Sequence, residues 1–406
     1  MNEVKVGGKK HRIQSLDVIR GVSILGVLAV NADGFAVPIR ASLNPGAWPF
    51  PNQGATAFAY WVMDCFFHEK FVALFSMLFG ISLFLVGGEL RDKKKGLNLT
   101  RRLLALVVLA LAHGFGLWWG DILITYAIAG ILMFSLRSLS SRALLTIGIC
   151  VLLGSAYRAL PDLGPVASVH DQVSVSAMNI PVTGGGMSPA IAAQMDVARS
   201  SAQGAYRVNT ETYLHQIANL WRLLPNTLAL MMIGLALFKS GFFANKASNK
   251  ACVITATVGA LALGCIGVTT WSADVFGVQA TLAAFVNATL APLVALGYAA
   301  VLMLTLRGAA APILSPFAAA GRMAFTNYVT QSLIMTSIFY GGRGALMGQV
   351  DRPGLWAIVV GVWIVQLCWS VLWLRRFEMG PLEWMWRWVT YGHRSPFLRE
   401  RVAQAK

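Results

Sequence analysis

The chain has 406 residues, of which 56% are hydrophobic and only 12% are charged, and its mean hydropathy is +0.62. Soluble globular domains carry roughly 25% charged residues, so this composition excludes a soluble protein and predicts an integral membrane protein. A net charge of +16 would suit nucleic-acid binding, but Lys and Arg here punctuate the ends of apolar segments. That distribution matches membrane topology, and we expect no nucleic-acid partner.

Ten apolar segments approach the length of about 20 residues that a helix needs to cross a bilayer. They are residues 18–36, 55–87, 102–119, 122–136, 143–160, 220–238, 252–272, 281–306, 317–339 and 354–374. We therefore predict an all-α fold, a polytopic transmembrane helix bundle of about ten spans. The second segment is too long for a single span, so we expect it to be tilted, broken or partly outside the membrane.

The distribution of basic residues predicts the orientation of these spans. Most Lys and Arg fall in segments on the side of the N-terminus, which by the positive-inside rule places both termini in the cytoplasm. The chain then divides into an N-terminal half with spans 1–5 (1–160), an extracytoplasmic segment (161–219) and a C-terminal half with spans 6–10 (220–406). A tail with three tryptophans between 384 and 388 suits a helix in the inner membrane interface.

The extracytoplasmic segment 161–219 begins with turn-forming Pro and Gly residues and continues as a helix-compatible run from about 190 to 218. This pattern predicts a partly helical cap over the outer face. A disordered linker is the alternative, because long loops without structure of their own are often linkers.

Ionisable residues within membrane spans usually face a protein interior or a water-filled cavity, because exposing them to lipid is expensive. Asp17 and Arg20 are three residues apart in the first span and can pair on one helical face, and Asn31 lies three turns further along the same stripe. One interpretation is an ion pair at the inner interface. The other is a pocket for an anionic ligand, because the planar guanidinium of Arg matches phosphate geometry.

The second span carries Asp64 and His68 at i and i+4, which a helix would stack on one face. Glu69 and Lys70 follow directly and cannot both share that face. The sequence lacks the second histidine of an HExxH motif, so we predict no metal site. A structural hydrogen-bond network and a chemical role remain open for this pair.

The stretch "HGFGLWWGD" places His113 near the outer half of the third span and Asp121 at the turn after it. If the segment folds back, Asp121 can approach His113 and hold the imidazole in one tautomer. Gly114, Gly116 and Gly120 lower the barrier to close backbone approach. The alternative is a buried histidine that merely bonds a backbone carbonyl.

Five motifs in order carry a family resemblance: "SLDVIRGVSILGVLAVN", "KFVALFSMLFG", "HGFGLWWGDILITYAIAG", "GRMAFTNYVTQSLI" and "GPLEWMWRWVTYG". Together they resemble the YeiB-like family of bacterial membrane proteins over residues 15–392. The "SLDxxRG" opening is more distantly similar to the transmembrane acyltransferase superfamily, which includes the acyltransferase-3 enzymes and heparan-α-glucosaminide N-acetyltransferase.

The resemblance implies a membrane-embedded acyltransferase that uses cytoplasmic acyl-CoA or acetyl-CoA as donor. The heparan enzyme has its catalytic histidine in the loop after span 1, and residues 37–63 contain none. Either His113 has that role, with Asp121 orienting it, or the chain lacks this chemistry. Residues expected to bind the donor are Asp17, Arg20, Arg101, Arg102 and Arg322. Residues expected to line the substrate cavity are Asn31, Asp33, Asp64, His68, Lys70, Tyr126, Asn327 and Tyr328.

Two other classes of function remain open from the sequence. Intramembrane His, Asp and Arg also serve proton-coupled transporters or channels, although we detect no inverted repeat of the kind that many carriers have. A non-catalytic lipid-binding protein is the third possibility. The expected partners are membrane lipids and a small-molecule or glycan acceptor, the expected location is a bacterial inner membrane, and a homodimer is left open. Direct transfer and a transient acyl-histidine are equally compatible with the sequence.

Overall fold

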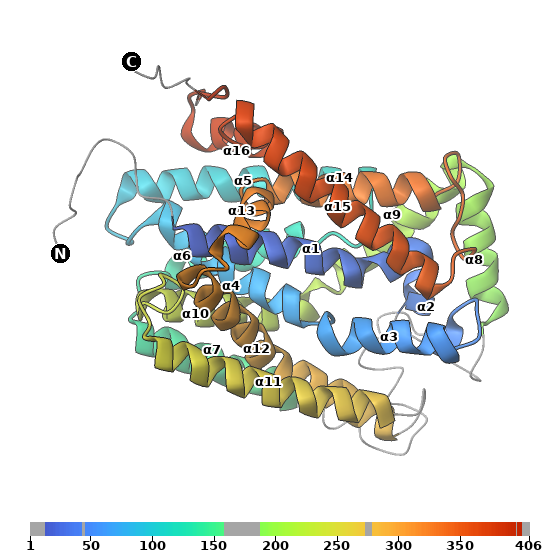
Figure 1. Cartoon of the computed structure of the whole chain (residues 1–406). Helices are drawn as coiled ribbons and strands as arrows, with labels where there is room; N and C mark the ends of the chain where they lie inside the picture. Colours follow the sequence, from blue (N-terminus) through green and yellow to red (C-terminus); the bar gives the residue numbers. More distant parts are fainter. Residues whose placement is uncertain (1–12, 43–44, 158–186, 273–277, 395, 400–406) are drawn as a thin grey trace.

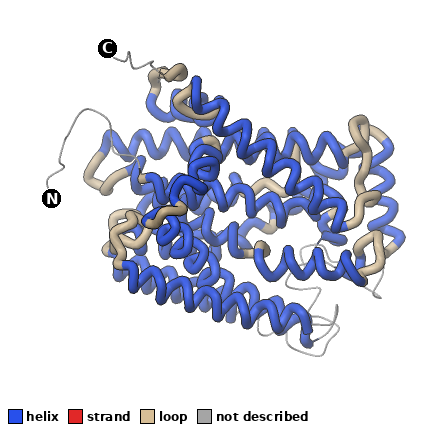
Figure 2. Tube along the Cα trace, in the orientation of Figure 1, coloured by secondary structure: helices blue, strands red, loops and turns tan. Residues whose placement is uncertain are grey.

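The computed structural model describes residues 13–42, 45–157, 187–272, 278–394 and 396–399. Over these residues the chain is helical, and the extended structure is limited to one isolated bridge between Phe377 and Leu398. Figures 1 and 2 show long helices running roughly along one direction, with short loops at the two ends of the bundle. The predicted all-α bundle is confirmed.

Each of the ten segments predicted as spans is mainly helical over its described residues; residues 158–160 of the fifth segment lie outside them. The helices of the first half are α1 (Gln14–Ala36), α2 (Ile39–Ser42), α3 (Gly54–Phe66), α4 (Lys70–Gly87), α5 (Lys93–Gly116), α6 (Leu123–Leu136) and α7 (Ser141–Tyr157). Those that follow are α8 (Pro189–Ser200), α9 (Ala202–Ala218), α10 (Leu220–Lys239), α11 (Asn249–Ser272), α12 (Val278–Arg307), α13 (Ser315–Arg322), α14 (Ala324–Phe339), α15 (Arg352–Arg376) and α16 (Pro381–Tyr391). Short 3₁₀ turns lie at Pro45–Ala47 and Ala311–Leu314.

Two of the predicted spans are interrupted. The long segment 55–87 breaks between α3 and α4, where Glu69 has a φ of 67°, in the left-handed region. This confirms that the second segment is not one regular helix. The segment 317–339 breaks at Met323, because the carboxylate of Glu383 accepts the backbone N–H groups of Phe325 and Thr326. The Glu383 carboxylate thus supplies a hydrogen-bond partner to backbone N–H groups in the first turn of the new helix, α14, which have no partner within the helix.

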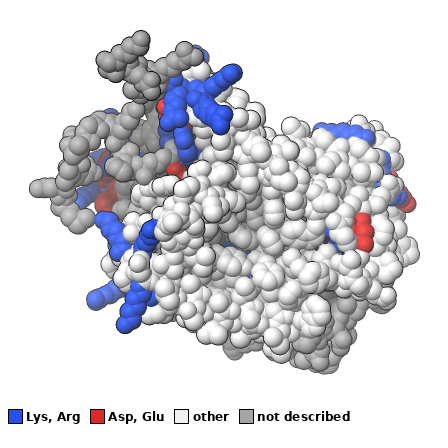
Figure 3. All heavy atoms as spheres, in the orientation of Figure 1, with Lys and Arg blue, Asp and Glu red and all other residues white. Residues whose placement is uncertain are grey.

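The surface is that of a multi-pass membrane protein. Among the described residues, seven helical segments are long and apolar enough to cross a membrane, with α3 and α4 counted together as one, and α6 and α7 are shorter apolar helices. Large hydrophobic side chains point outward along the bundle; Val108, Val268 and Leu261 are each about two-thirds exposed (67%, 70% and 67%). On the face drawn in Figure 3, Lys and Arg gather toward the two ends, and the belt between them is nearly free of charge. An apolar belt bounded by charged ends is what a bilayer requires.

The bundle is built around α1, which lies in the middle of the other helices in Figure 1. Eighteen of its 23 residues are buried. It meets α13 where Gly21 faces Gly321, and a Cβ on Gly321 would lie 1.8 Å from the Asp17 carbonyl oxygen. Small residues let membrane helices approach this closely, and tight packing replaces the hydrophobic effect as the source of helix association in lipid.

The two ends of the bundle differ, and we name them by their helices. The α16 end carries α16 and the loops before α5 and after α10, whereas the α9 end carries α8 and α9 (Figure 1). The helical run predicted from about 190 to 218 is confirmed, because residues 189–200 and 202–218 form α8 and α9. The rest of the predicted cap, 161–186, lies outside the described residues.

Candidate active site

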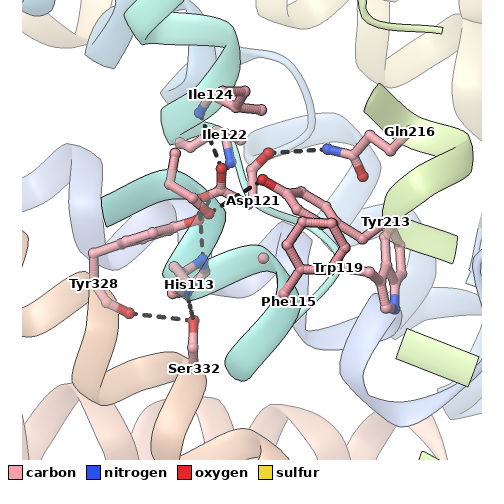
Figure 4. A network of polar contacts seen from close by, with 12 residues as sticks. His113, Phe115, Trp119, Asp121, Ile122, Ile124, Tyr213, Gln216, Tyr328 and Ser332 are labelled. Carbon is pink, nitrogen blue, oxygen red and sulfur yellow. Dashed lines mark hydrogen bonds and ion pairs between the residues drawn. The ribbon is translucent and has the colours of Figure 1, made fainter. Parts of the chain in front are cut away.

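His113 and Asp121 form a buried hydrogen-bonded pair at the point where α5 turns back into α6. The Nδ1 atom of His113 lies 3.0 Å from Oδ1 of Asp121, and the two side chains are only 3% and 0% exposed. A carboxylate oxygen can only accept, so Nδ1 carries the hydrogen. The second oxygen, Oδ2, accepts the Ile124 N–H at 2.9 Å and thereby caps α6. The predicted fold-back therefore brings the two groups together (Figure 4).

Helix α9 holds this fold-back in place from the α9 end of the bundle. The Tyr213 ring lies directly over Gly114, where a Cβ would approach the ring to 2.0 Å. The Asn209 amide donates to the Gly114 carbonyl at 2.8 Å and accepts the Trp119 N–H at 2.7 Å. Gln216 donates to the backbone carbonyl of Asp121 at 2.9 Å. Glycine at 114 is thus required by packing, and α9 covers the pair.

Ser332 lies on the opposite side of the imidazole. Its Oγ is 2.8 Å from Nε2 of His113, and Ser332 is 1% exposed (Figure 4). Because Nδ1 donates to Asp121, Nε2 of a neutral imidazole accepts a hydrogen bond from the serine hydroxyl. The Tyr328 ring packs beside the imidazole, with 5.0 Å between ring centroids. Sequence reasoning missed Ser332, although it lies within the motif "GRMAFTNYVTQSLI" that carried the resemblance.

A cavity of about 270 Å³ opens near the α16 end and runs toward this pair. Its mouth carries four arginines: Arg20, Arg102, Arg322 and Arg387. Its middle walls are apolar, formed by Phe75, Leu78, Phe79 and Leu106, and its buried end is formed by Ile122, Tyr126 and Tyr328. Tyr328 both lines the cavity and packs on His113, whereas His113, Asp121 and Ser332 are not part of the lining.

The arginines at the mouth are held in place by neighbours. Arg20 contacts Asp17 at 3.2 Å, as the spacing predicts. The guanidinium of Arg102 lies 4.0 Å from the centre of the Trp386 ring, and Arg322 donates to the Glu378 carbonyl at 2.7 Å. Stacking on an aromatic face orients a guanidinium while leaving its edge available to a ligand.

Helix α16 forms one wall of the mouth and is fixed by Glu383. This carboxylate lines the cavity and bonds the first turn of α14. Burial raises the pKa of Glu383 above its ordinary value, because the loss of water outweighs the hydrogen bonds that favour the ionised form. The tail predicted as an interfacial helix therefore also contributes Glu383, Trp386 and Arg387 to the cavity, which the sequence alone did not indicate.

Several residues predicted for the site lie elsewhere. Of the expected cavity residues only Tyr126 and Tyr328 line this cavity; those outside its lining are Asn31, Asp33, Asp64, His68, Lys70 and Asn327. Arg101 is exposed and does not line the cavity, whereas its neighbour Arg102 does, since adjacent helical residues diverge by about 100°. Asp17 contributes through its contact with Arg20. Asn327 donates to Ser370 at 3.1 Å in a helix–helix contact.

A second polar cluster surrounds the break between α3 and α4. His68 Nδ1 lies 2.8 Å from Asp64 Oδ1, so the predicted pair exists, although His68 lies in the turn after α3 and not in a helix. The fully buried Lys70 donates to the Asp64 carbonyl at 2.7 Å and to Asn287 of α12 at 2.6 Å. These bonds replace the backbone partners that the break removes and thereby stabilise the break.

A third polar pair lies toward the α9 end, between α1 and α15. Nε of Arg352 is 3.7 Å from Oδ2 of Asp33, and the guanidinium stacks between Trp48 and Tyr60. The separation exceeds a hydrogen bond, and both atoms are buried without a hydrogen-bond partner. Asp33 therefore belongs to this contact and is remote from the cavity.

The fold and the site define a multi-pass α-helical membrane protein with a buried polar site. A model of the family described as "Protein of unknown function (DUF418)" matches residues 237–393. The chain is 32% identical to "Uncharacterized protein YeiB" of Escherichia coli (strain K12), covering 94% of this chain and 97% of that protein. It is 28% identical to "Uncharacterized protein YxaH" of Bacillus subtilis (strain 168), covering 96% of each. The chain belongs to the YeiB-like family, as the resemblance predicted.

Proposed function

We propose that the protein is a membrane-embedded acyltransferase that takes an acyl group from acyl-CoA and passes it to a hydroxyl or amine. The observation that carries the proposal is the cavity that runs from four arginines at its mouth to Tyr328, which packs on the His113 of the His113–Asp121 pair. Guanidinium groups bind phosphate with paired hydrogen bonds, and the apolar walls suit an acyl chain. The mouth thus suits the phosphate groups of an acyl-CoA, and the interior suits its apolar acyl chain.

The dimensions of the cavity indicate which part of the donor it holds. Pockets for drug-sized ligands run from roughly 300 to 1,000 Å³, and this cavity, at about 270 Å³, is slightly smaller than that range. We therefore assign the pantetheine arm and a short acyl group to the interior. The phosphates of the nucleotide then lie at the arginines of the mouth, where Arg387 is exposed.

The pair supplies general-base chemistry. His113 Nε2 would remove the proton from the nucleophile that attacks the thioester carbonyl, and would return that proton to the departing CoA sulfur. Asp121 would hold the Nδ1–H tautomer and stabilise the imidazolium that forms. A positioned general base contributes about 10²–10⁴-fold to the rate.

The orientation of the donor follows from charge. The α16 end carries most of the Lys and Arg and would face the cytoplasm, where acyl-CoA is made. The α9 end would then face outward, and α9 would cover the site on the acceptor side. The location consistent with this arrangement is a bacterial inner membrane, with both termini in the cytoplasm and a small-molecule or glycan acceptor outside.

The proposal is tested by measuring CoA binding and acetyl-CoA turnover with the purified protein in lipid nanodiscs. Removing a charge-assisted hydrogen bond typically costs about 1.5–3 kcal/mol, so Arg102→Gln should weaken CoA binding by roughly one to two orders of magnitude. The matched control is Arg101→Gln, which removes the same charge one residue away, outside the cavity. Equal losses in both variants, or no CoA binding by the native protein, would refute the proposal.

A proton-coupled carrier is the second candidate, and the broken second span favours it. Discontinuous helices with ionisable groups at the break are typical of transporter binding sites, and Asp64, His68 and Lys70 surround this one. A carrier should neither bind acyl-CoA at the arginines nor release CoA from it. Binding of CoA without turnover would instead indicate a non-catalytic lipid- or CoA-binding protein.

A further inference from the structure

We propose that Ser332 is the nucleophile of a Ser332–His113–Asp121 triad and carries the acyl group covalently between donor and acceptor. This inference rests on the proposed acyl-transfer function and adds a residue and an intermediate to it. Its basis is the row of contacts from Ser332 Oγ to Nε2 of His113 (2.8 Å) and from Nδ1 to Asp121 Oδ1 (3.0 Å). A hydroxyl, an imidazole and a carboxylate in this order activate a serine for attack on a carbonyl.

The direction of the Ser332 hydroxyl distinguishes it from other serines in the bundle. Buried hydroxyls in membrane helices usually donate to the carbonyl four residues earlier. Ser23 and Ser76 do so at 2.7 and 2.8 Å. Ser332 lies 3.4 Å from the corresponding Tyr328 carbonyl, a much poorer contact than its 2.8 Å approach to His113. Its proton is therefore directed at the imidazole, as a nucleophile and its base require.

Ser332 also lies on the line that the cavity follows. On α14 the cavity is lined by Ala324, Phe325 and Tyr328, and Ser332 is the next residue on the same helical face, about 6 Å deeper at 1.5 Å per residue. On α5 the cavity is lined by Arg102 and Leu106, and His113 follows two turns further on the same face. A thioester that moves past Tyr328 would meet both groups.

A covalent intermediate fits the way the site is enclosed. The donor would enter from the α16 end, whereas on the α9 side the pair is covered by Asn209, Tyr213 and Trp119. An acyl-serine removes the need for donor and acceptor to be bound together. CoA can leave by the cavity before the cover over the pair opens to an acceptor.

The chemistry balances in two steps. Ser332 Oγ attacks the thioester carbonyl and its proton passes to His113 Nε2; the C–S bond breaks and the thiolate takes that proton to give free CoA. The acceptor hydroxyl or amine then attacks the serine ester and gives its proton to Nε2. The bond from the acyl carbon to Oγ breaks, and Oγ recovers the proton. The net reaction transfers the acyl group from CoA to the acceptor.

The test uses the full chain in nanodiscs and two probes: an alkyl fluorophosphonate, which reports a nucleophilic serine without any acyl-CoA, and acetyl-CoA, whose adduct is located by peptide mass spectrometry. We expect both to modify the native protein at Ser332. Modification should be lost in Ser332→Ala and lowered about 10²–10⁴-fold in His113→Ala. The matched control is Ser23→Ala, which removes a buried hydroxyl that bonds its own helix and should leave modification unchanged.

A third variant separates chemistry from folding. Ser332→Cys keeps a nucleophile of similar size, so it should still accept acetyl from acetyl-CoA, now as a thioester that neutral hydroxylamine cleaves. Native acetyl-CoA turnover in Ser332→Ala, or adducts that map to another residue, would overturn the covalent role while leaving the proposed function intact. Absence of CoA binding by the native protein would count against the proposed function itself. Fluorophosphonate labelling of Ser332 in that case would still support the triad.

Discussion

Replacing Asp121 by Asn should leave the fold intact and remove nearly all activity. The two oxygens of Asp121 accept from different donors, Oδ1 from His113 Nδ1 and Oδ2 from the Ile124 N–H. An asparagine can keep only one oxygen. If that oxygen faced His113, the amide NH₂ would oppose the Ile124 N–H and leave buried donors unpaired, at about 1–3 kcal/mol.

The other orientation of the asparagine satisfies every group and should therefore be adopted. Its oxygen accepts the Ile124 N–H, and its NH₂ donates to Nδ1 of His113. The imidazole must then carry its hydrogen on Nε2, the atom that faces Ser332. A base that is already protonated on the reacting nitrogen cannot accept another proton, and the same inversion in a serine-protease triad lowers kcat by about 10⁴.

The assay for Asp121→Asn is release of free CoA from acetyl-CoA, read by mass spectrometry, together with the melting temperature of the purified protein. We expect a rate reduced by about 10³–10⁴-fold and a melting temperature close to that of the native protein. The double variant with His113→Ala should be no slower than His113→Ala alone, because groups that act as a unit are not additive. A native rate in Asp121→Asn would refute the tautomer argument.

Three further predictions test the architecture around the site. In a chain lacking its native cysteines, an impermeant maleimide added to intact cells should label Glu211→Cys on α9 and not Lys94→Cys at the start of α5, both exposed positions. The reverse labelling pattern would invert the orientation. Gly114→Ala should lower the melting temperature, because the added methyl group meets the Tyr213 ring and overpacking costs about 1–3 kcal/mol. Gly116→Ala, which has open space around the added methyl group, should leave the melting temperature unchanged. The pKa of Glu383 is raised above 4.5 in the folded protein, so the folded state binds the proton more tightly and its stability falls as pH rises through that pKa. Relative to Glu383→Gln, the native protein should therefore gain stability as pH is lowered from 7 toward 4.5. A stability difference that does not depend on pH would contradict the claim that burial favours the uncharged carboxyl group.

The sequence contained enough to predict the spans and the pair at the end of α5. Hydropathy located each helix, since lipid demands apolar segments of a set length. The eight-residue spacing of His113 and Asp121 allowed one short turn to join them, and the glycines between them permitted it. The Asp17–Arg20 and Asp64–His68 pairs followed from helical spacing alone.

The cavity and the serine could not be predicted in the same way. Ser332 meets His113 across 219 residues of sequence, and Trp386 meets Arg102 across 284, so both contacts depend on how α14 and α16 pack against α5. The sequence of an apolar helix does not show clearly which face points into the protein, because the lipid and the protein core are equally apolar. For that reason the sequence could not distinguish Arg102, which lines the cavity, from its neighbour Arg101, which does not. The same holds for Tyr328, which lines the cavity, and its neighbour Asn327, which does not.

Acyl transfer from CoA to Ser332 is tested most directly by a structure of the protein bound to a thioether analogue of acetyl-CoA, whose C–S bond the site cannot cleave. We predict that the phosphates lie against Arg20, Arg102, Arg322 and Arg387. The carbon that stands for the acyl group should lie beside Tyr328, within about 3.5 Å of Ser332 Oγ. An analogue bound with its phosphates at the α9 end, or with its acyl group at the Asp64–His68 cluster, would contradict the central claim.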